Sequence, residues 1–315
     1  MKESYSNLAF VFPGQGSQSV GMLSDIAQNY PEVKEVFQCA SDILDIDLWR
    51  LTVEGPEQTL NLTENTQPAM LAAGVAMWKV WCRNSDVRPG WMAGHSLGEY
   101  SALVCSGALT FEDAIKLVAK RANFMQEAVP AGIGAMAAIL GLDEPAVVSI
   151  CAKITGDESV SPANFNAPGQ IVIAGHRLAV ERAVELASEE GAKRAIILPV
   201  SVPSHCILME SAAGQLDEYL QKTPIEPPTI SIIHNSDVAS HVSPEVIRSV
   251  LKDQLTHPVR WIDSIKFMSE QGVDGFIECG PGRVLSGLNK RIAKGCKAIP
   301  LFNCESLDKA LELVQ

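Results

Sequence analysis

The chain has 315 residues, of which 47% are hydrophobic and 20% are charged, and its formal net charge is −12. This length predicts about two structural units, or one large unit with an insertion, and the composition is that of a globular protein. The acidic balance argues against a nucleic-acid-binding surface, which needs a basic face to neutralise phosphates.

No segment has the features of a membrane span or an export signal. The apolar run near the N-terminus is too short for a signal-peptide core, and the longest mostly apolar stretch, 68–80, is too short to cross a bilayer. Eight cysteines show no CxxC pair and no metal-ligand spacing. We therefore expect a cytoplasmic protein with reduced thiols, no membrane contact and no bound metal.

The first part of the chain alternates short apolar strands with amphipathic helices, which is typical of an α/β fold. A strand at 8–12 leads into the turn Pro13-Gly14-Gln15-Gly16. A helix with Pro68 near its start is predicted to run to about residue 81, because proline suits the first helical turn. A short strand at 91–93 and a helix ending near 106 follow. A further helix at 111–126 begins with Thr110 and Asp113 in a pattern like a capping box.

The next seventy or so residues predict a β-α-β-β-α-β order, which is the ferredoxin-like motif. The expected elements are at 134–140, 144–154, 160–165, 170–175, 178–190 and 194–200. Strands resume near 230–234, 275–278 and 297–301. We predict a large α/β-hydrolase-like domain with a parallel central sheet, 1–129 and 202–315, and an inserted ferredoxin-like subdomain, 130–201. A cleft between the two is the expected ligand site.

The sequence Gly94-His95-Ser96-Leu97-Gly98 lies between a predicted strand and a predicted helix. That arrangement is typical of a nucleophile elbow, in which glycines permit a tight turn and helix N-terminal N–H groups face a developing oxyanion. A tight structural turn is the other interpretation, and the strand and helix on either side favour a nucleophilic Ser96.

A nucleophilic serine needs a base, and six histidines are available: 95, 176, 205, 234, 241 and 257. The side chain of His95 should point away from its neighbour Ser96, and His176 and His241 are expected at the surface. His205 lies where the chain returns from the predicted insertion to the large domain. Position alone favours His205 and leaves His234 and His257 open.

Arg121 falls on the apolar stripe of the helix predicted at 111–126, whereas the other charged residues of that helix take the polar face. A guanidinium that points inward needs a partner, and its planar fork suits a carboxylate. An internal Asp or Glu is one possible partner, and a substrate carboxylate is the other.

The chain resembles the malonyl-CoA:acyl carrier protein transacylases of fatty acid synthesis over nearly its whole length. The resemblance rests on motifs in order: FVFPGQGSQ (10–18), QPA (67–69), GHSLGEYSAL (94–103), RANFMQEAVP (121–130), GAMAAILGL (134–142), NFNAPGQIVIAG (164–175), PVSVPSH (199–205), PVRW (258–261) and ECGPG (278–282).

The resemblance implies a ping-pong acyltransferase that carries malonyl from malonyl-CoA through Ser96 to the phosphopantetheine thiol of acyl carrier protein, without metal or redox cofactor. It makes His205 the base and Arg121 the partner of the malonyl carboxylate. The remaining implied roles are the oxyanion-hole N–H groups of Gln15 and Leu97, the Gln254 carbonyl that orients His205, and the supporting side chains of His95 and Asn166.

An acidic carrier protein would need a local positive surface on this acidic chain. Two basic pairs are candidates for carrier docking, namely Lys193 with Arg194 and Lys290 with Arg291. Ordinary solvated charge is the other interpretation of these residues.

Two alternative functions remain. A serine esterase or thioesterase of the α/β-hydrolase type shares the GxSxG motif, but its histidine comes near the C-terminus, whereas more than a hundred residues follow His205. A non-catalytic scaffold with the same fold would have no need to keep Ser96, His205 and Arg121 together.

Overall fold

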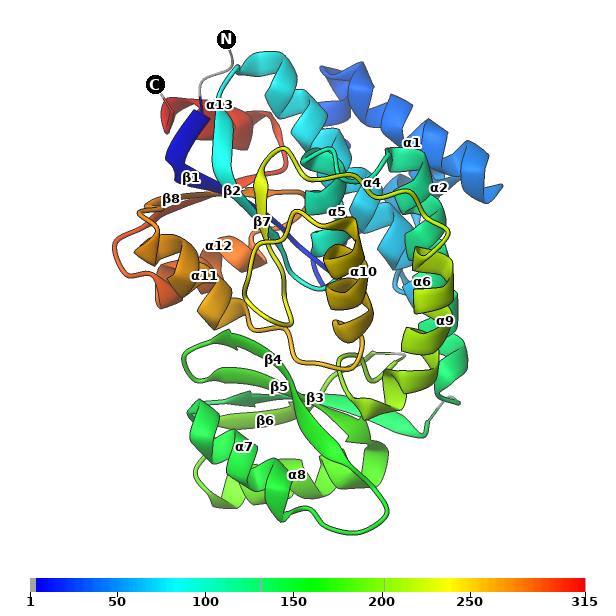
Figure 1. The fold of residues 1–315 in the computed structure, drawn as a ribbon, viewed down its shortest axis with the longest axis vertical. Helices are drawn as coiled ribbons and strands as arrows, with labels where there is room; N and C mark the ends of the chain where they lie inside the picture. The colour runs from blue at the N-terminus through cyan, green and yellow to red at the C-terminus, as the bar shows by residue number, and fades with distance from the viewer. Residues whose placement is uncertain (1–3, 131, 201, 315) are drawn as a thin grey trace.

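Two separate β-sheets organise the computed structural model, which describes residues 4–130, 132–200 and 202–314. Within these residues one sheet has five strands, all parallel, in the order β7-β2-β1-β8-β9. Their bounds are β1 (Ser4–Phe12), β2 (Arg88–Gly94), β7 (Ser231–Ile233), β8 (Gly275–Cys279) and β9 (Lys297–Leu301). The α/β fold with a parallel sheet that the sequence predicts is therefore present (Figure 1).

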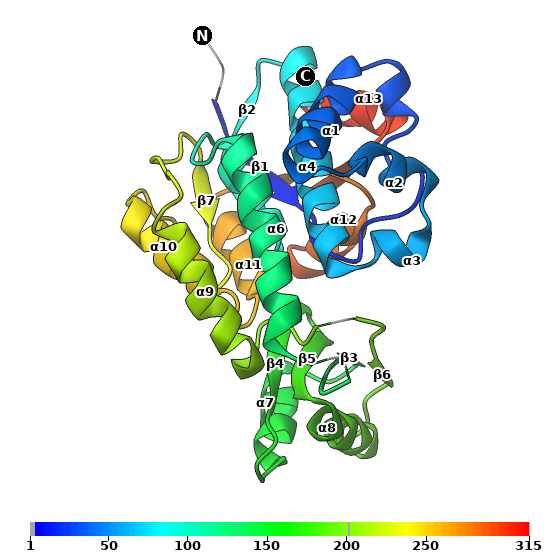
Figure 2. The same cartoon turned by 90° about the vertical axis from the view of Figure 1, so that its right-hand side faces the viewer.

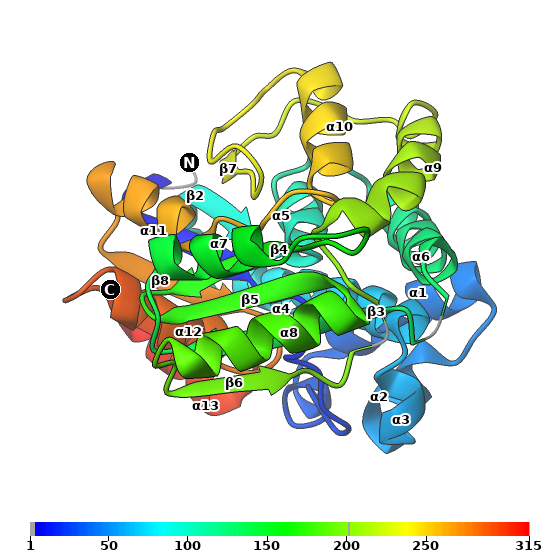
Figure 3. The ribbon, with the colours of Figure 1, turned by 90° about the horizontal axis from the view of Figure 1, so that it is seen from below.

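The second sheet has the order β4-β5-β3-β6 and is antiparallel throughout. Its strands are β3 (Gly134–Leu140), β4 (Val160–Ala167), β5 (Gln170–His176) and β6 (Arg194–Ile197), and its helices are α7 (Glu144–Lys153) and α8 (Arg177–Glu189). Both helices cover the face of this sheet that points away from the five-stranded sheet (Figures 1 and 3).

Helices pack on both faces of the five-stranded sheet. The longest of the described helices is α4 (Thr63–Asn84). The tall helix in the middle of Figure 2 is α6 (Phe111–Ala128). The others are α1 (Pro31–Leu44), α2 (Leu48–Glu54), α3 (Glu57–Leu60), α5 (Gly98–Cys105), α9 (Glu210–Leu220), α10 (Pro244–Asp253), α11 (Trp261–Glu270), α12 (Val284–Ile292) and α13 (Cys304–Glu312), with short 3-10 turns at Ile26–Gln28 and Ile207–Met209.

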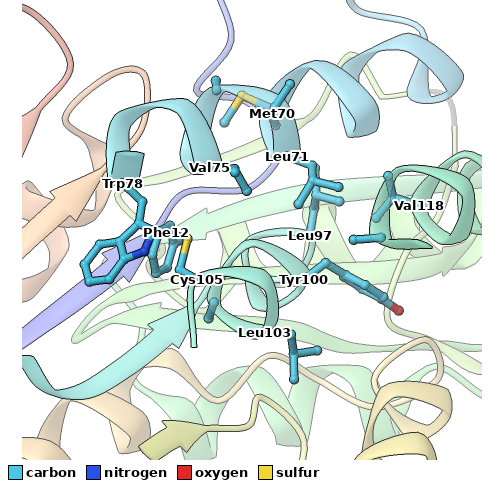
Figure 4. Packing of buried hydrophobic residues seen from close by; sticks show 14 of the residues in the cluster. Phe12, Met70, Leu71, Val75, Trp78, Leu97, Tyr100, Leu103, Cys105 and Val118 are labelled. Carbon is cyan, nitrogen blue, oxygen red and sulfur yellow. The ribbon is translucent and has the colours of Figure 1, made fainter. Parts of the chain in front are cut away.

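Strand β1 sorts its side chains by the two-residue period of a strand. Phe10 and Phe12 belong to the apolar cluster formed with α1, α4, α5 and α6, whereas Ala9 and Val11 belong to the cluster formed with α11 and α12. Figure 4 shows the first cluster, in which side chains of α4 face Leu97 and Tyr100 at the start of α5. Because β1 is buried on both faces, it is held firmly, and so is the turn at its carboxyl end.

Backbone hydrogen bonds join β4 of the four-stranded sheet to Val259, which lies outside the five-stranded sheet. The Phe165 N–H donates to the Val259 carbonyl at 2.9 Å, and the Val259 N–H donates to the Ala163 carbonyl at 2.9 Å. Strand β4 is thereby fixed beside the segment that precedes α11.

Several predicted bounds are wrong. The helix expected to start near Pro68 begins five residues earlier at Thr63, so Pro68 lies inside it. The missing N–H of Pro68 is tolerated because the carbonyl it would have bonded belongs to Glu64, an exposed residue of the first turn. Strand β2 spans Arg88–Gly94 rather than the shorter 91–93, and β6 ends at Ile197 rather than at 200.

The described residues include no helix that is both long and apolar enough to cross a membrane. All eight cysteines are free, four of them buried: 105, 151, 206 and 279. The expected boundaries of the insertion remain a prediction, and its last residue, 201, lies outside the described residues.

Candidate active site

Ser96 lies in the tight turn between β2, which ends at Gly94, and α5, which begins at Gly98. Its φ of 52° is in the left-handed region, which is uncommon for a residue with a side chain. The neighbouring glycines are required sterically, because a Cβ on Gly94 would overlap the backbone of Gly98 and a Cβ on Gly98 would overlap the carbonyl of Phe12. Such a turn holds the Ser96 hydroxyl clear of the strand and the helix.

Asn235, which follows β7, braces this turn from the side. Its Oδ1 accepts a hydrogen bond from the Ser96 N–H at 2.7 Å, and its Nδ2 donates to the Gly94 carbonyl at 2.6 Å. Asn235 is buried, so both bonds are shielded from water. A side chain 139 residues away in sequence therefore stabilises the strained backbone of Ser96.

His205 is the histidine that contacts Ser96, with 2.8 Å between its Nε2 and the Ser96 Oγ. Its Nδ1 lies 2.7 Å from the main-chain carbonyl oxygen of Gln254. Because a carbonyl oxygen only accepts, Nδ1 carries the proton and Nε2 presents its lone pair to the serine. Burial and, next, the charge of Arg121 lower the pKa of His205 to about 3, so the ring is neutral near pH 7.

The other histidines lie elsewhere in the described residues. His95 Nε2 lies 2.8 Å from Asn166 Oδ1, and the ring lies against Trp261. Its pKa is lowered by burial. The remaining four have partners away from Ser96: His176 with Ser159, His234 with Glu99, His241 with Asp237, and His257 with Asp253 and Thr256.

Arg121 projects from α6 into the same place and is 0% exposed. One terminal nitrogen, NH1, donates to Gln67 Oε1 at 2.8 Å, and the other, NH2, donates to Gln254 Oε1 at 2.9 Å and lies 3.4 Å from Ser96 Oγ. The guanidinium also lies over the Tyr100 ring, 5.4 Å from its centroid. Burial lowers the pKa of Arg121, yet a guanidinium stays charged in proteins.

No Asp or Glu forms an ion pair with Arg121 within the described parts of the chain. The internal ion pair that the sequence left open is therefore not formed. A buried cation held by neutral groups is poised for an anionic partner, because burying an unpaired charge is unfavourable. Because the Ser96 hydroxyl lies 3.4 Å from the guanidinium, an anion bound to Arg121 would lie close to that hydroxyl.

The turn that contains Gln15 lies against the elbow that contains Leu97. The turn after β1 packs on the elbow so closely that a Cβ added to Gly14 would lie 3.7 Å from the Leu97 nitrogen. Neither the Gln15 N–H nor the Leu97 N–H donates a hydrogen bond within the described residues. Leu97 is the residue that precedes the first turn of α5, where backbone N–H groups lack helical partners. The Leu97 N–H, which directly follows Ser96, is therefore a free donor at the elbow, and the turn that carries the Gln15 N–H packs against it.

Two of the four basic residues considered for carrier docking line a cavity, and the other two do not. Lys193 and Arg291 line one cavity of about 380 Å³ with residues 140–141 and 168–170. Arg291 donates to Gln170 Oε1 at 2.5 Å and to the Pro168 carbonyl at 2.8 Å, so it ties α12 to the β4–β5 turn. All four residues are exposed, and Arg194 and Lys290 are not part of this cavity. A second cavity, of about 550 Å³, is lined by residues 19–25, 281–283 and 302–303 and contains none of the predicted site residues.

The sequence did not single out the side chains of Gln67, Gln254 and Asn235, nor that of Glu99. Gln67 and Glu99 belong to recognised motifs, but a polar residue in a motif does not reveal which partner it contacts. In the part of the chain described, no group of three or more His, Cys, Asp or Glu residues has a metal-binding arrangement. The assembled groups suit the roles of a nucleophile, a neutral base, oxyanion donors and a cationic partner for a carboxylate.

Comparison with known proteins shows which family the chain is similar to. The family model for the acyl transferase domain matches residues 9–301. The chain is 52% identical to the malonyl CoA-acyl carrier protein transacylase of Escherichia coli (strain K12) over 308 residues, which are 98% of this chain and 100% of that protein.

Solved structures agree with the fold. The malonyl CoA-acyl carrier protein transacylase from Coxiella burnetii superposes with a TM-score of 0.96 at 50% identity and covers 97% of each chain. A malonyl-transacylase solved in complex with a type II PKS acyl-carrier protein has a TM-score of 0.96 at 50% identity, over 98% of this chain and 99% of that one.

Proposed function

The chain belongs to the family of malonyl-CoA–acyl carrier protein transacylases, and from that membership we propose that it carries malonyl from malonyl-CoA to the phosphopantetheine thiol of an acyl carrier protein in fatty acid synthesis. The single observation that carries this proposal is the buried, carboxylate-free Arg121 guanidinium 3.4 Å from Ser96 Oγ. It gives a carboxylate-bearing acyl group a partner at the reacting hydroxyl.

In the first half-reaction, the Ser96 Oγ attacks the thioester carbonyl while His205 Nε2 takes the hydroxyl proton. The carbonyl oxygen becomes an oxyanion that the Gln15 and Leu97 N–H groups face. The C–S bond then breaks, His205 returns the proton to the departing thiolate, and malonyl remains as an ester of Ser96. Arg121 holds the free carboxylate through charge-assisted hydrogen bonds.

In the second half-reaction, the pantetheine thiol of the carrier gives its proton to His205 and attacks the ester carbonyl. The C–O bond breaks, and His205 protonates the leaving Ser96 Oγ. Because the Gln254 carbonyl fixes the tautomer of His205, this pair works without a carboxylate as third member. His95 and Asn166 would support the wall of the site. Every step uses protein groups, so the proposal includes no metal or redox cofactor.

The finer architecture is also part of the proposal. The order β4-β5-β3-β6 with two helices on one face supports an inserted ferredoxin-like subdomain at 130–201, and the nucleophile elbow on a parallel sheet supports a hydrolase-like large domain. Eight free thiols suit a reducing compartment, which supports a cytoplasmic location. The basic residues at 193, 194, 290 and 291 are proposed for carrier docking.

Mixing the protein with malonyl-CoA alone tests this function. We expect one burst of coenzyme A, stoichiometric with enzyme, followed by resumed release once a phosphopantetheinylated carrier protein is added. Continuous release of free malonate over many turnovers without carrier would instead identify a thioesterase.

A further inference from the structure

A buried carboxylate, that of Glu99, contacts two residues of the candidate site, Asn235 and Gln254. Glu99 belongs to the first turn of α5 and is 0% exposed. Its Oε1 lies 2.7 Å from His234 Nδ1, and its Oε2 accepts hydrogen bonds from the Asn235 N–H at 3.1 Å and from Gln254 Nε2 at 2.8 Å. A carboxylate with this many donors is well satisfied despite its burial.

The side-chain amide of Gln254 stands between that carboxylate and Arg121. Its Nε2 donates to Glu99 Oε2 and also to the Ser96 carbonyl at 3.0 Å. Its Oε1 accepts from Arg121 NH2 at 2.9 Å. Since Nε2 already faces two acceptors, the amide has one satisfactory orientation, with its oxygen toward the guanidinium.

This arrangement keeps opposite charges apart inside the protein. A direct ion pair between Glu99 and Arg121 would use the donors of the planar guanidinium in a bidentate contact. Instead, Gln254 and Gln67 hold Arg121 through neutral oxygens, and the Nε of Arg121 has no hydrogen-bond partner among the described residues. The negative charge of Glu99 therefore compensates the positive charge of Arg121 through space. Because the Gln254 amide lies between them, Glu99 does not use the hydrogen-bond donors of the guanidinium.

We propose that the side chain of Gln254 determines selectivity for carboxylate-bearing acyl groups by separating Glu99 from Arg121, so that the guanidinium stays available to the substrate. This inference rests on the proposed function, in which Arg121 receives the malonyl carboxylate. Gln254 thus has two independent tasks, because its main-chain carbonyl orients His205 and its side chain keeps the cation free.

A swap of the two side chains tests the proposal with formal charge conserved. In the double variant Glu99→Gln with Gln254→Glu, the carboxylate moves one position closer and pairs directly with Arg121, while the main-chain carbonyl at 254 stays. The measurement is the rate of acyl-enzyme formation by intact mass, with malonyl-CoA and with acetyl-CoA. We expect the malonyl-to-acetyl ratio to fall about tenfold or more, the effect of losing one hydrogen bond to a charged group.

The matched control is Glu99→Gln alone, which keeps the shape of the side chain but puts no carboxylate on Arg121. Its malonyl-to-acetyl ratio should stay close to that of the wild type, whatever its absolute rate. A ratio that falls as far in this control as in the swap would overturn the proposal, as would an unchanged ratio in a folded swap.

A second pair of variants decides the matter if the swap does not fold. Gln254→Ala opens the space between the two charges, so Arg121 should pair with Glu99 and the ratio should fall. Adding Glu99→Gln to that variant should restore the ratio, a rescue that a purely structural role of Gln254 would not give. Absence of rescue overturns the proposal. Arg121→Ala is the reference, because a ratio retained in that variant refutes the proposed role of Arg121 itself.

Discussion

At the scale of single residues, Ser96, His205 and Arg121 come from different segments and meet because buried polar groups hold each one. Side chains hold Ser96 and Arg121, and a main-chain carbonyl holds His205. Gln67 lies 54 positions from Arg121, and Gln254 lies 133 positions from it. Sequence patterns placed Arg121 inward and favoured Ser96, since helical periodicity and the GxSxG spacing are local signals. They did not identify Glu99, Asn235 or the Gln254 amide, because those contacts exist only once distant segments have packed.

Arg121 should control acyl selectivity. We expect Arg121→Ala to slow acylation by malonyl-CoA, with a loss of about 2–5 kcal/mol of transition-state stabilisation. The substitution removes the buried cation that would pair with the malonyl carboxylate. Acetyl transfer should decrease far less, since acetyl has no free carboxylate. Single-turnover acylation with both thioesters measures this difference. Equal losses for the two substrates would show that Arg121 has only a structural role.

His205 should make stability depend on pH in a defined direction. Its pKa in the folded protein is lowered to about 3, so between the ordinary histidine value and that pH the unfolded chain binds a proton that the folded chain does not. Stability from this neutral ring is therefore complete above the unfolded pKa and is lost as pH falls toward 3.

Comparison with His205→Gln isolates that contribution. The free energy of unfolding, measured by urea denaturation from pH 7 down to pH 4, should fall more steeply in the wild type than in the variant. Parallel curves would mean that His205 titrates normally in the folded state.

At the scale of elements, short strands bounded by glycine or by turns were the most predictable. The bounds of β3 and β9 match the sequence prediction, whereas the start of α4 does not. Pro68 suggested a helix start because proline prefers first-turn positions. The fold instead buries the helix from Thr63 onward, and packing overrides the local preference.

The turn between β2 and α5 depends on its glycines. Gly98→Ala should destabilise the protein by about 1–3 kcal/mol or more and reduce acylation, because the new methyl group overlaps the carbonyl of Phe12. Gly287→Ala in α12 is the matched control. A Cβ there meets no atom within 4 Å, so alanine should stabilise the helix by about 0.5–1 kcal/mol.

Thermal unfolding of both variants checks this prediction. A melting temperature in Gly98→Ala equal to that of the wild type would mean that the backbone of the turn can move aside without loss.

At the scale of the whole molecule, the second sheet does more than extend the fold. Strand β4 bonds to Val259 beside the site, and Asn166 at its end contacts His95. The order of the strands and helices of the second sheet along the chain was predicted from the sequence. The contact between β4 and Val259 was not predicted, because it depends on two backbone bonds between residues more than ninety positions apart.

Carrier docking is a prediction at this scale. The test uses Arg194→Glu with Lys290→Glu, since both residues are exposed, whereas Arg291 ties α12 to the β4–β5 turn. The double reversal should raise the KM for the carrier protein and flatten its salt dependence, because charges at an interface rim act mainly on encounter rate. Transfer to free pantetheine should not change. Unchanged carrier kinetics at low salt would eliminate these two residues as docking sites.

The central claim is that malonyl passes through an ester on Ser96. Intact-mass analysis and peptide mapping after exposure to malonyl-CoA, followed by addition of a phosphopantetheinylated carrier protein, test it most directly. The account predicts one malonyl group on Ser96 that the carrier removes and takes up, no adduct in Ser96→Ala, and much slower formation in His205→Ala. A carrier that becomes malonylated by the Ser96→Ala variant at the wild-type rate would contradict it.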